Sequence, residues 1–262
     1  MKNGKVTLVG AGPGDPELLT VKAVKAIQAA SVLLVDDLVS DEIVALARSG
    51  ARIVHVGKRG GCKSTPQAFI DKLMVAAARE GENVVRLKGG DPFIFGRGGE
   101  ELEQLRAAGI EVAVVNGITS GLAAATALGF ALTHREHAQG VVFITAHAKK
   151  GQQPSDWRAL AATAHSAKLT LVIYMGVSSA QRVQDELLTG LPATTPVAVV
   201  QHASLPRQRQ WTTELGQLVE TIRREGISSP AVIVVGEVAR AAVLARQHDA
   251  PEQPRRSQRP GS

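Results

Sequence analysis

The sequence of 262 residues predicts an α/β fold made of two α/β domains with a ligand cleft between them. Short apolar runs alternate with amphipathic stretches along most of the chain. Continuous apolar strands separated by helices are typical of a mostly parallel sheet that is buried on both faces. Glycine-rich loops follow several of these runs, and the spacing of the runs changes in the second half. Two lobes with a ligand between them are the architecture that this pattern favours.

The first half holds five apolar runs, and each is followed by a stretch with helical periodicity. Parallel strands are expected at residues 6–9, 32–35, 53–56, 84–87 and 112–115. Helices are expected at about 17–29, 41–49, 66–80, 99–108 and 119–128. Pro16 and Pro66 fall at two expected helix starts, where proline is tolerated, and Thr65 is a suitable N-cap.

The second half alternates in the same way but less regularly. Strands are expected at residues 141–145, 170–174, 197–200, 208–212 and 231–235. Helices are expected at about 155–164, 178–188, 214–225 and 237–246. Because helices separate the last three strands less regularly, a mixed sheet is expected there. The predicted organisation is a first domain over 1–116, a second over 117–245, and a disordered tail over 246–262 that is rich in Pro, Gln and Arg.

Composition narrows the classes of function. Four arginines against two acids in the tail give +2 of the total net charge of +6, which leaves +4 for the rest. A mildly basic body with 3% aromatic residues fits a small anionic substrate and makes nucleic-acid binding a weak alternative. Cys62 is the only cysteine, which excludes an internal disulfide and a thiolate-rich metal site. Without a bilayer-length apolar run or a signal-peptide pattern, we expect a cytoplasmic protein with no membrane partner.

The first glycine loop, residues 10–16, reads Gly-Ala-Gly-Pro-Gly-Asp-Pro and resembles a dinucleotide-binding fingerprint. Asp15 stands where the third glycine of that fingerprint belongs, and Pro13 lacks an N–H that would cradle a pyrophosphate. Asp36, after the second expected strand, is close to where an acid would bind a ribose. An NAD-dependent oxidoreductase and a turn without a ligand both remain open interpretations of this loop.

The second glycine loop, residues 86–101, is more specific. Gly89 and Gly90 would let a ligand approach the backbone closely, and Asp91 could accept hydrogen bonds from an amine or a hydroxyl. Phe93, Ile94 and Phe95 add an apolar wall. In a third loop, Thr119 and Ser120 could cap the following helix or bind a ligand.

Further segments complete a family pattern. They are Val-Gly-Lys-Arg at 56–59, Leu-Thr-His-Arg at 132–135, Tyr-Met-Gly at 174–176 and the strand at 229–236. With these segments and the loops, the chain resembles the uroporphyrinogen-III C-methyltransferases, which are tetrapyrrole methylases. The resemblance runs from about residue 5 to 240. It implies methylation of uroporphyrinogen III at carbons 2 and 7 by S-adenosylmethionine, giving precorrin-2 for cobalamin or sirohaem synthesis and S-adenosylhomocysteine as by-product. A cytoplasmic homodimer is implied, and another precorrin methyltransferase is a close alternative.

The resemblance also implies roles for individual residues. Donor contacts are expected from Pro13, Gly89, Gly90, Asp91, Ile94, Thr119, Ser120, Met175 and Ala203. Catalytic roles are expected for Asp36, Lys58, Arg97 and Glu100. Substrate carboxylates are expected to be held by Arg59, Lys63 and Arg135.

Some positions depart from the family or invite another interpretation. Asp37 stands where the family usually has arginine, and Lys63 stands where histidine is common. His134 and His137 are near each other, but the sequence suggests no third ligand at suitable spacing. We therefore expect no metal.

Overall fold

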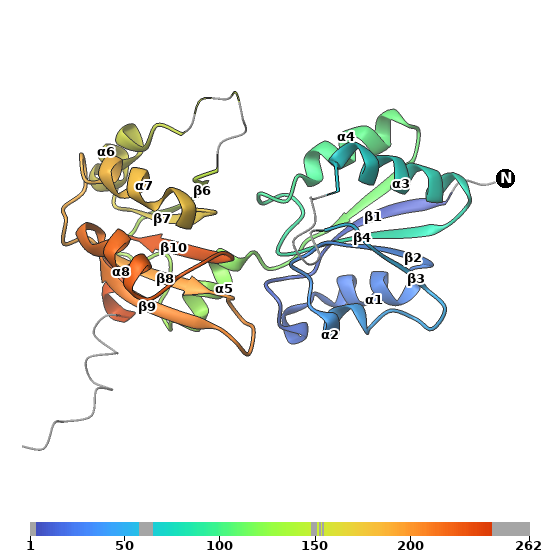
Figure 1. Cartoon of the computed structure of the whole chain (residues 1–262), viewed down its shortest axis with the longest axis horizontal. Helices are drawn as coiled ribbons and strands as arrows, with labels where there is room; N and C mark the ends of the chain where they lie inside the picture. Colours follow the sequence, from blue (N-terminus) through green and yellow to red (C-terminus); the bar gives the residue numbers. More distant parts are fainter. Residues whose placement is uncertain (1–3, 58–64, 148–150, 152, 154, 243–262) are drawn as a thin grey trace, which may run out of the picture.

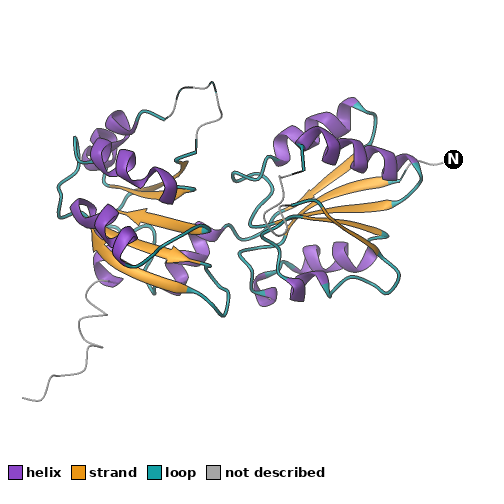
Figure 2. Cartoon of the chain, in the orientation of Figure 1, coloured by secondary structure: helices purple, strands orange, loops and turns teal. Residues whose placement is uncertain are grey.

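A computed structural model describes residues 4–57, 65–147, 151, 153 and 155–242. It contains two five-stranded sheets, one from each half of the chain (Figures 1 and 2). The first sheet has the order β3-β2-β4-β1-β5 and is parallel throughout. Its strands are β1 Lys5–Gly10, β2 Val32–Val35, β3 Arg52–His55, β4 Asn83–Lys88 and β5 Glu111–Val115.

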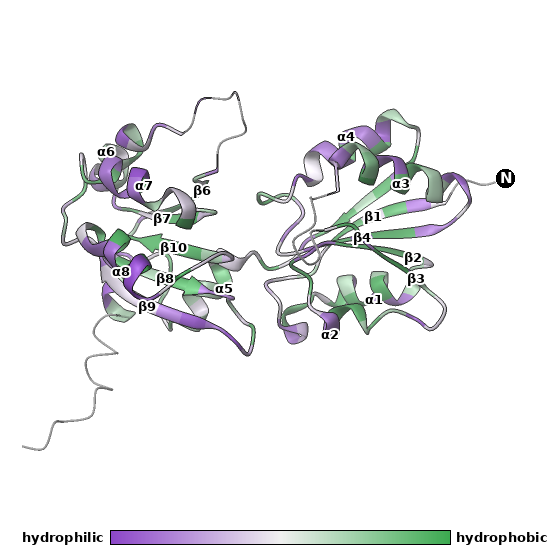
Figure 3. Ribbon diagram, in the orientation of Figure 1, coloured by the Kyte–Doolittle hydropathy of each residue, from purple (hydrophilic) through white to green (hydrophobic). Residues whose placement is uncertain are grey.

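Helices cover both faces of the first sheet, because alternate strand residues point to opposite faces. Helices α3 (Gln67–Arg79) and α4 (Gly98–Ala107) pack on the face that includes Leu8, whereas α1 (Val21–Ala29) and α2 (Asp41–Val44) pack on the face that includes Val9 (Figure 1). The sheet is thus the middle layer of three, and its apolar strands stand out in Figure 3.

The second sheet is mixed, as the sequence predicts. Its order is β6-β7-β10-β8-β9; β6 and β7 are parallel, and β10 runs antiparallel to both β7 and β8. The strands are β6 Gly140–Thr145, β7 Leu169–Tyr174, β8 Pro196–Gln201, β9 Arg209–Glu214 and β10 Ala231–Val235. One face carries α5 (Ser120–Ala127), and the other carries α6 (Trp157–Ser166), α7 (Ala180–Leu187) and α8 (Leu218–Arg224).

Several expected helices are shorter than predicted. The helix expected at 17–29 is divided into the 3₁₀ turn Pro16–Leu18 and α1, because the extended backbone of Leu19 ends the first piece and Thr20 caps the second through a 3.1 Å hydrogen bond from the Ala23 N–H. The helix expected at 41–49 is the single turn of α2. Further 3₁₀ turns are Val177–Ser179, Leu215–Gln217 and Glu237–Ala239. The expected disordered tail at 246–262 lies outside the described residues.

Among the described helices, none combines the length and the apolar character that crossing a membrane requires.

Candidate active site

The two glycine loops meet at the carboxyl edge of the first sheet. In the parallel register Gly10 lies beside Lys88, so the loops leave β1 and β4 at the same level. They are joined by two hydrogen bonds, Gly12 N–H to Gly90 O at 3.1 Å and Gly90 N–H to Gly12 O at 2.7 Å. Both glycines have left-handed backbone, with φ of 69° and 68°, which favours glycine. The loops therefore form one continuous floor.

A cavity of about 1310 Å³ opens above this floor and is lined from both halves of the chain. The first half contributes the loops and the segment after β2, and the second half contributes the ends of β7 and β8. All the donor contacts predicted from the sequence except Asp91 line it, namely Pro13, Gly89, Gly90, Ile94, Thr119, Ser120, Met175 and Ala203. The predicted catalytic acid Asp36 lines it as well.

Asp91 lies behind the floor rather than on the cavity wall. Its buried carboxylate accepts hydrogen bonds from Phe93 N–H at 2.8 Å, Gly117 N–H at 3.1 Å and Asn116 Nδ2 at 3.2 Å. Since these partners come from the second and third loops, Asp91 ties the two loops together. The prediction that Asp91 contacts the donor gains no support from this position.

A buried group of charges supports Asp36. Arg86 and Lys88 alternate along β4 and so point to the same side, where the fully buried Glu101 of α4 receives both of them. The Arg86 Nε–Glu101 Oε1 distance is 3.2 Å, and the Lys88 Nζ–Glu101 Oε2 distance is 3.0 Å. Arg86 also pairs with Asp36 across 3.5 Å, and the Asp36 side chain keeps 38% of its surface exposed.

Burial is the main cause that lowers the pKa of Lys88, and the neighbouring Arg86 charge lowers it further. Glu101 opposes this effect because its carboxylate favours the charged ammonium. Sequence reasoning missed this group as a unit. Its signal was two cations two residues apart in an otherwise apolar strand.

Comparison with known proteins shows the family of this chain. The sequence pattern of the Tetrapyrrole (Corrin/Porphyrin) Methylases matches residues 5–219. The chain belongs to this family. A curated relative from Pseudomonas aeruginosa, uroporphyrinogen-III C-methyltransferase, is 52% identical over 92% of this chain and 96% of its own length.

Other relatives agree with the tetrapyrrole methylase assignment. Siroheme synthase 3 from Aeromonas hydrophila is 50% identical over 91% of this chain, but the match covers 50% of that longer protein. A crystal structure of uroporphyrin-III C-methyl transferase from Thermus thermophilus complexed with S-adenyl homocysteine is similar with a TM-score of 0.76 and 40% identity, covering 91% of this chain and 100% of that one.

The sheet order separates this methylase from a dinucleotide-binding fold. In the Rossmann order 3-2-1-4-5-6, β1 lies beside β2, and the fingerprint loop and the ribose-binding acid are on adjacent strands. Here β4 lies between β1 and β2. The strand order therefore argues against the NAD interpretation of the first glycine loop.

Three predicted residues do not reach the cavity wall. Arg97 and Glu100 form an exposed ion pair at the start of α4, with Nε–Oε1 at 3.1 Å, and this hydrogen bond is the main cause that raises the pKa of Arg97. Arg135 belongs to a turn at the amino ends of β6 and β7, whereas the cavity is at the carboxyl end of β7. The two ends of this six-residue strand are roughly 17 Å apart, at a rise of about 3.3 Å per residue. Lys58, Arg59 and Lys63 lie outside the described residues.

Strained backbone marks the cavity at three positions. Phe95, Met175 and His202 line it, and each has a φ of 53° without being glycine. Such conformations cost energy and cluster at functional sites. Of the three, the resemblance indicated Met175, and the second glycine loop indicated Phe95 as part of an apolar wall. Local sequence carries no signal for the left-handed backbone itself, because tertiary contacts impose that conformation.

A potential third metal ligand lies beside His134 and His137. These histidines stack with ring centroids 4.5 Å apart, and together with Glu136 they offer ligand atoms within 4.8 Å of one another. All three side chains are exposed, and His134 Nδ1 already accepts a hydrogen bond from Glu136 N–H. The expectation that the methylase needs no metal stays a prediction.

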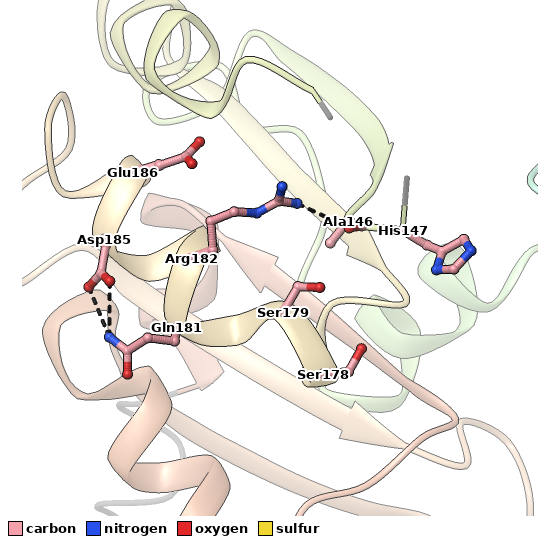
Figure 4. A pocket seen from close by; sticks show the side chains of 8 residues that line it. All are labelled: Ala146, His147, Ser178, Ser179, Gln181, Arg182, Asp185 and Glu186. Carbon is pink, nitrogen blue, oxygen red and sulfur yellow. Dashed lines mark hydrogen bonds between the residues drawn. The ribbon is translucent and has the colours of Figure 1, made fainter. Parts of the chain in front are cut away.

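A second, more open pocket of about 740 Å³ lies beside α7 in the second half of the chain (Figure 4). Three of its polar side chains are engaged with neighbouring groups: Arg182 donates to Ala146 O at 3.3 Å, and Gln181 donates to both oxygens of Asp185 at 3.0 and 3.1 Å. Of the predicted site residues that the structure describes, none lines this pocket. The larger cavity is accordingly the candidate active site.

Proposed function

We propose that this chain is an S-adenosylmethionine-dependent uroporphyrinogen-III C-methyltransferase that methylates carbons 2 and 7 and releases precorrin-2. The observation that carries the proposal is the gathering of the predicted donor contacts around one cavity, in a chain 52% identical to a curated enzyme of that name. Precorrin-2 would then supply either cobalamin or sirohaem synthesis.

The cavity fits the methyl donor chemically. Its floor is glycine backbone, and a side chain added at Gly89 would approach Leu38 Cβ to 2.7 Å, so glycine is what permits the close packing of the floor against the segment after β2. Phe95 and Met175 supply apolar contact. Asp36, Asp37, Asp41 and Glu42 give one wall a negative charge, which suits a cationic sulfonium.

The donor, when bound, supplies an already activated methyl group, so no metal is required for the transfer. The chain has to align the nucleophilic ring carbon with that methyl and exclude water, and alignment can lower a barrier by roughly 7–11 kcal/mol. A carbon–carbon bond forms as the sulfur–methyl bond breaks. The methylated ring then loses a proton, and Asp36, held by Arg86 at the cavity edge, is the proposed acceptor.

The finer assignments rest on the family resemblance. We propose a cytoplasmic homodimer whose domains span 1–116 and 117–245. Light scattering after size exclusion would test the dimer, and full activity in the presence of EDTA would test the absence of a metal.

The activity is tested by anaerobic incubation with S-adenosylmethionine and uroporphyrinogen III, followed by product mass. Addition of two methyl groups is the expected result, and Asp36→Asn should reduce it strongly. Unmethylated uroporphyrinogen together with calorimetric binding of S-adenosylhomocysteine would indicate another tetrapyrrole as substrate. Failure of both measurements would overturn the proposal.

A further inference from the structure

We infer that Tyr174 is a positioning residue that fixes the Thr119–Ser120 segment for the methyl donor through its phenol hydroxyl. This inference rests on the proposed function, because it assigns the donor to the cavity that Tyr174 lines. Tyr174 is the last residue of β7, and Met175 follows it on the same wall.

The hydroxyl of Tyr174 joins two points of the third loop. The Thr119 Oγ1–Tyr174 Oη distance is 2.6 Å, and Gly121 N–H donates to the same Oη at 2.8 Å. A side chain at Gly121 would collide with that hydroxyl, so this glycine is what permits the contact. The two hydrogen bonds therefore set where α5 begins relative to the second sheet.

The Tyr174 hydroxyl has one fixed and one two-way hydrogen bond. Gly121 N–H can only donate, so Oη accepts from it, whereas either hydroxyl can donate in the hydrogen bond between Thr119 Oγ1 and Tyr174 Oη. When the phenol donates, the Thr119 hydrogen is available to a molecule in the cavity. Burial is the main cause that raises the pKa of Tyr174, which keeps the phenol protonated at neutral pH.

The ring of Tyr174 is held from both halves of the chain. Phe95 of the second glycine loop lies at a centroid distance of 4.9 Å, and Phe143 of β6 packs edge-on at 6.1 Å. Since Tyr174 is 9% exposed, the ring has little freedom to move its hydroxyl away from Thr119. One side chain thus fixes the third loop while it touches the second.

The test is calorimetric binding of S-adenosylhomocysteine to the full chain and to Tyr174→Phe, well below the melting temperature of each. Loss of the hydroxyl should weaken binding about tenfold, as expected for a buried hydrogen bond. Phe143→Leu is the matched control, because it disturbs the packing of the same ring and keeps the hydroxyl. We expect it to lower the melting temperature while the dissociation constant stays within about twofold.

A double-mutant cycle distinguishes positioning from general stability. If Tyr174 acts through Thr119, Thr119→Val/Tyr174→Phe should bind no more weakly than Thr119→Val alone. Additive losses, or equal affinity of wild type and Tyr174→Phe, would overturn the inference and leave the proposed function standing. Absence of binding to the wild type would instead overturn the proposed function, and this inference with it.

Discussion

Glu101 is the residue on which the buried charges of the first lobe depend. It faces two buried cations, Arg86 and Lys88, and is itself fully buried. Removing one partner of such a group leaves an uncompensated charge away from water. The residue is therefore more sensitive to substitution than the exposed acids on the same helix.

Glu101→Gln should lower the free energy of unfolding by about 3–5 kcal/mol, because two buried cations lose their shared carboxylate. Urea unfolding would measure the loss. Glu103→Gln, an equal change on the exposed side of α4, should stay within about 0.5 kcal/mol of wild type. Equal stability of the two variants would contradict the importance of the buried charges.

Lys88 gives the stability of the protein a pH dependence with a definite sign. Its pKa is lowered in the folded state, chiefly by burial, so the unfolded chain holds the proton more tightly. The unfolding free energy of the wild type should therefore rise as pH increases from the folded pKa towards about 10.5. Lys88→Met should lose this rise, while the surface change Lys72→Met should keep it. Parallel curves of stability against pH for Lys88→Met and wild type would refute the assignment.

At the scale of elements, strands were easier to predict than helix ends. All ten strands of the described residues were expected, nine of them from apolar runs, since burial of both faces of a sheet leaves a continuous signal; β9 is the polar exception. The helix at 17–29 was wrong because Thr20 works as a cap in the middle of a periodic stretch. The order of the first sheet could not be predicted, because pairing of β4 with β1 depends on contacts far apart in the chain.

The candidate site was predicted unevenly for similar reasons. Glycines such as Gly89 and Gly90 indicate that a ligand can approach the backbone closely, so the floor of the cavity could be predicted from the sequence. The buried charges behind the floor were not recognisable. Glu101 pairs with Lys88 only because the intervening loop and the first turn of α4 fold back onto β4, and the sequence does not define that path. The left-handed backbone of Phe95 and His202 likewise results from tertiary contacts rather than local preference.

The cap at Thr20 can be tested on its own. Thr20→Ala should lower the unfolding free energy by about 1 kcal/mol, because Ala23 N–H loses its acceptor at the start of α1. Thr20→Ser retains the hydroxyl and should recover most of the loss. Chemical denaturation of the three proteins would decide, and equal loss in both variants would assign the effect to the methyl group.

At the scale of the whole molecule, the cavity couples the two lobes. Both tryptophans, Trp157 and Trp211, lie in the second lobe, so tryptophan fluorescence reports unfolding of that lobe. The cavity wall nevertheless includes the glycine floor of the first lobe and Met175 of the second. A ligand in this cavity should therefore protect both.

S-adenosylhomocysteine at 100 times its dissociation constant should stabilise the folded chain by about 2.7 kcal/mol. That corresponds to a rise of roughly 5 °C or more in the melting temperature followed by tryptophan fluorescence. Adenosine at the same concentration as S-adenosylhomocysteine serves as the control for ligand identity, because a weaker ligand raises the melting temperature less at equal concentration. A melting temperature that does not change would mean that the donor binds without engaging the second lobe.

The position of β4 between β1 and β2 also governs how the protein can be made. During synthesis β1 emerges early, yet its neighbours are β4 and β5, and Lys5 pairs with Asn83. The backbone N–H and C=O groups of β1 therefore stay without their strand partners until the ribosome has released the chain beyond residue 88. Because Gly89 and Gly90 follow directly, the donor floor is completed together with the centre of the sheet. A nascent chain thus completes the glycine floor of the cavity in the same step that covers one edge of β1, before β5 and the second half of the cavity wall have been made.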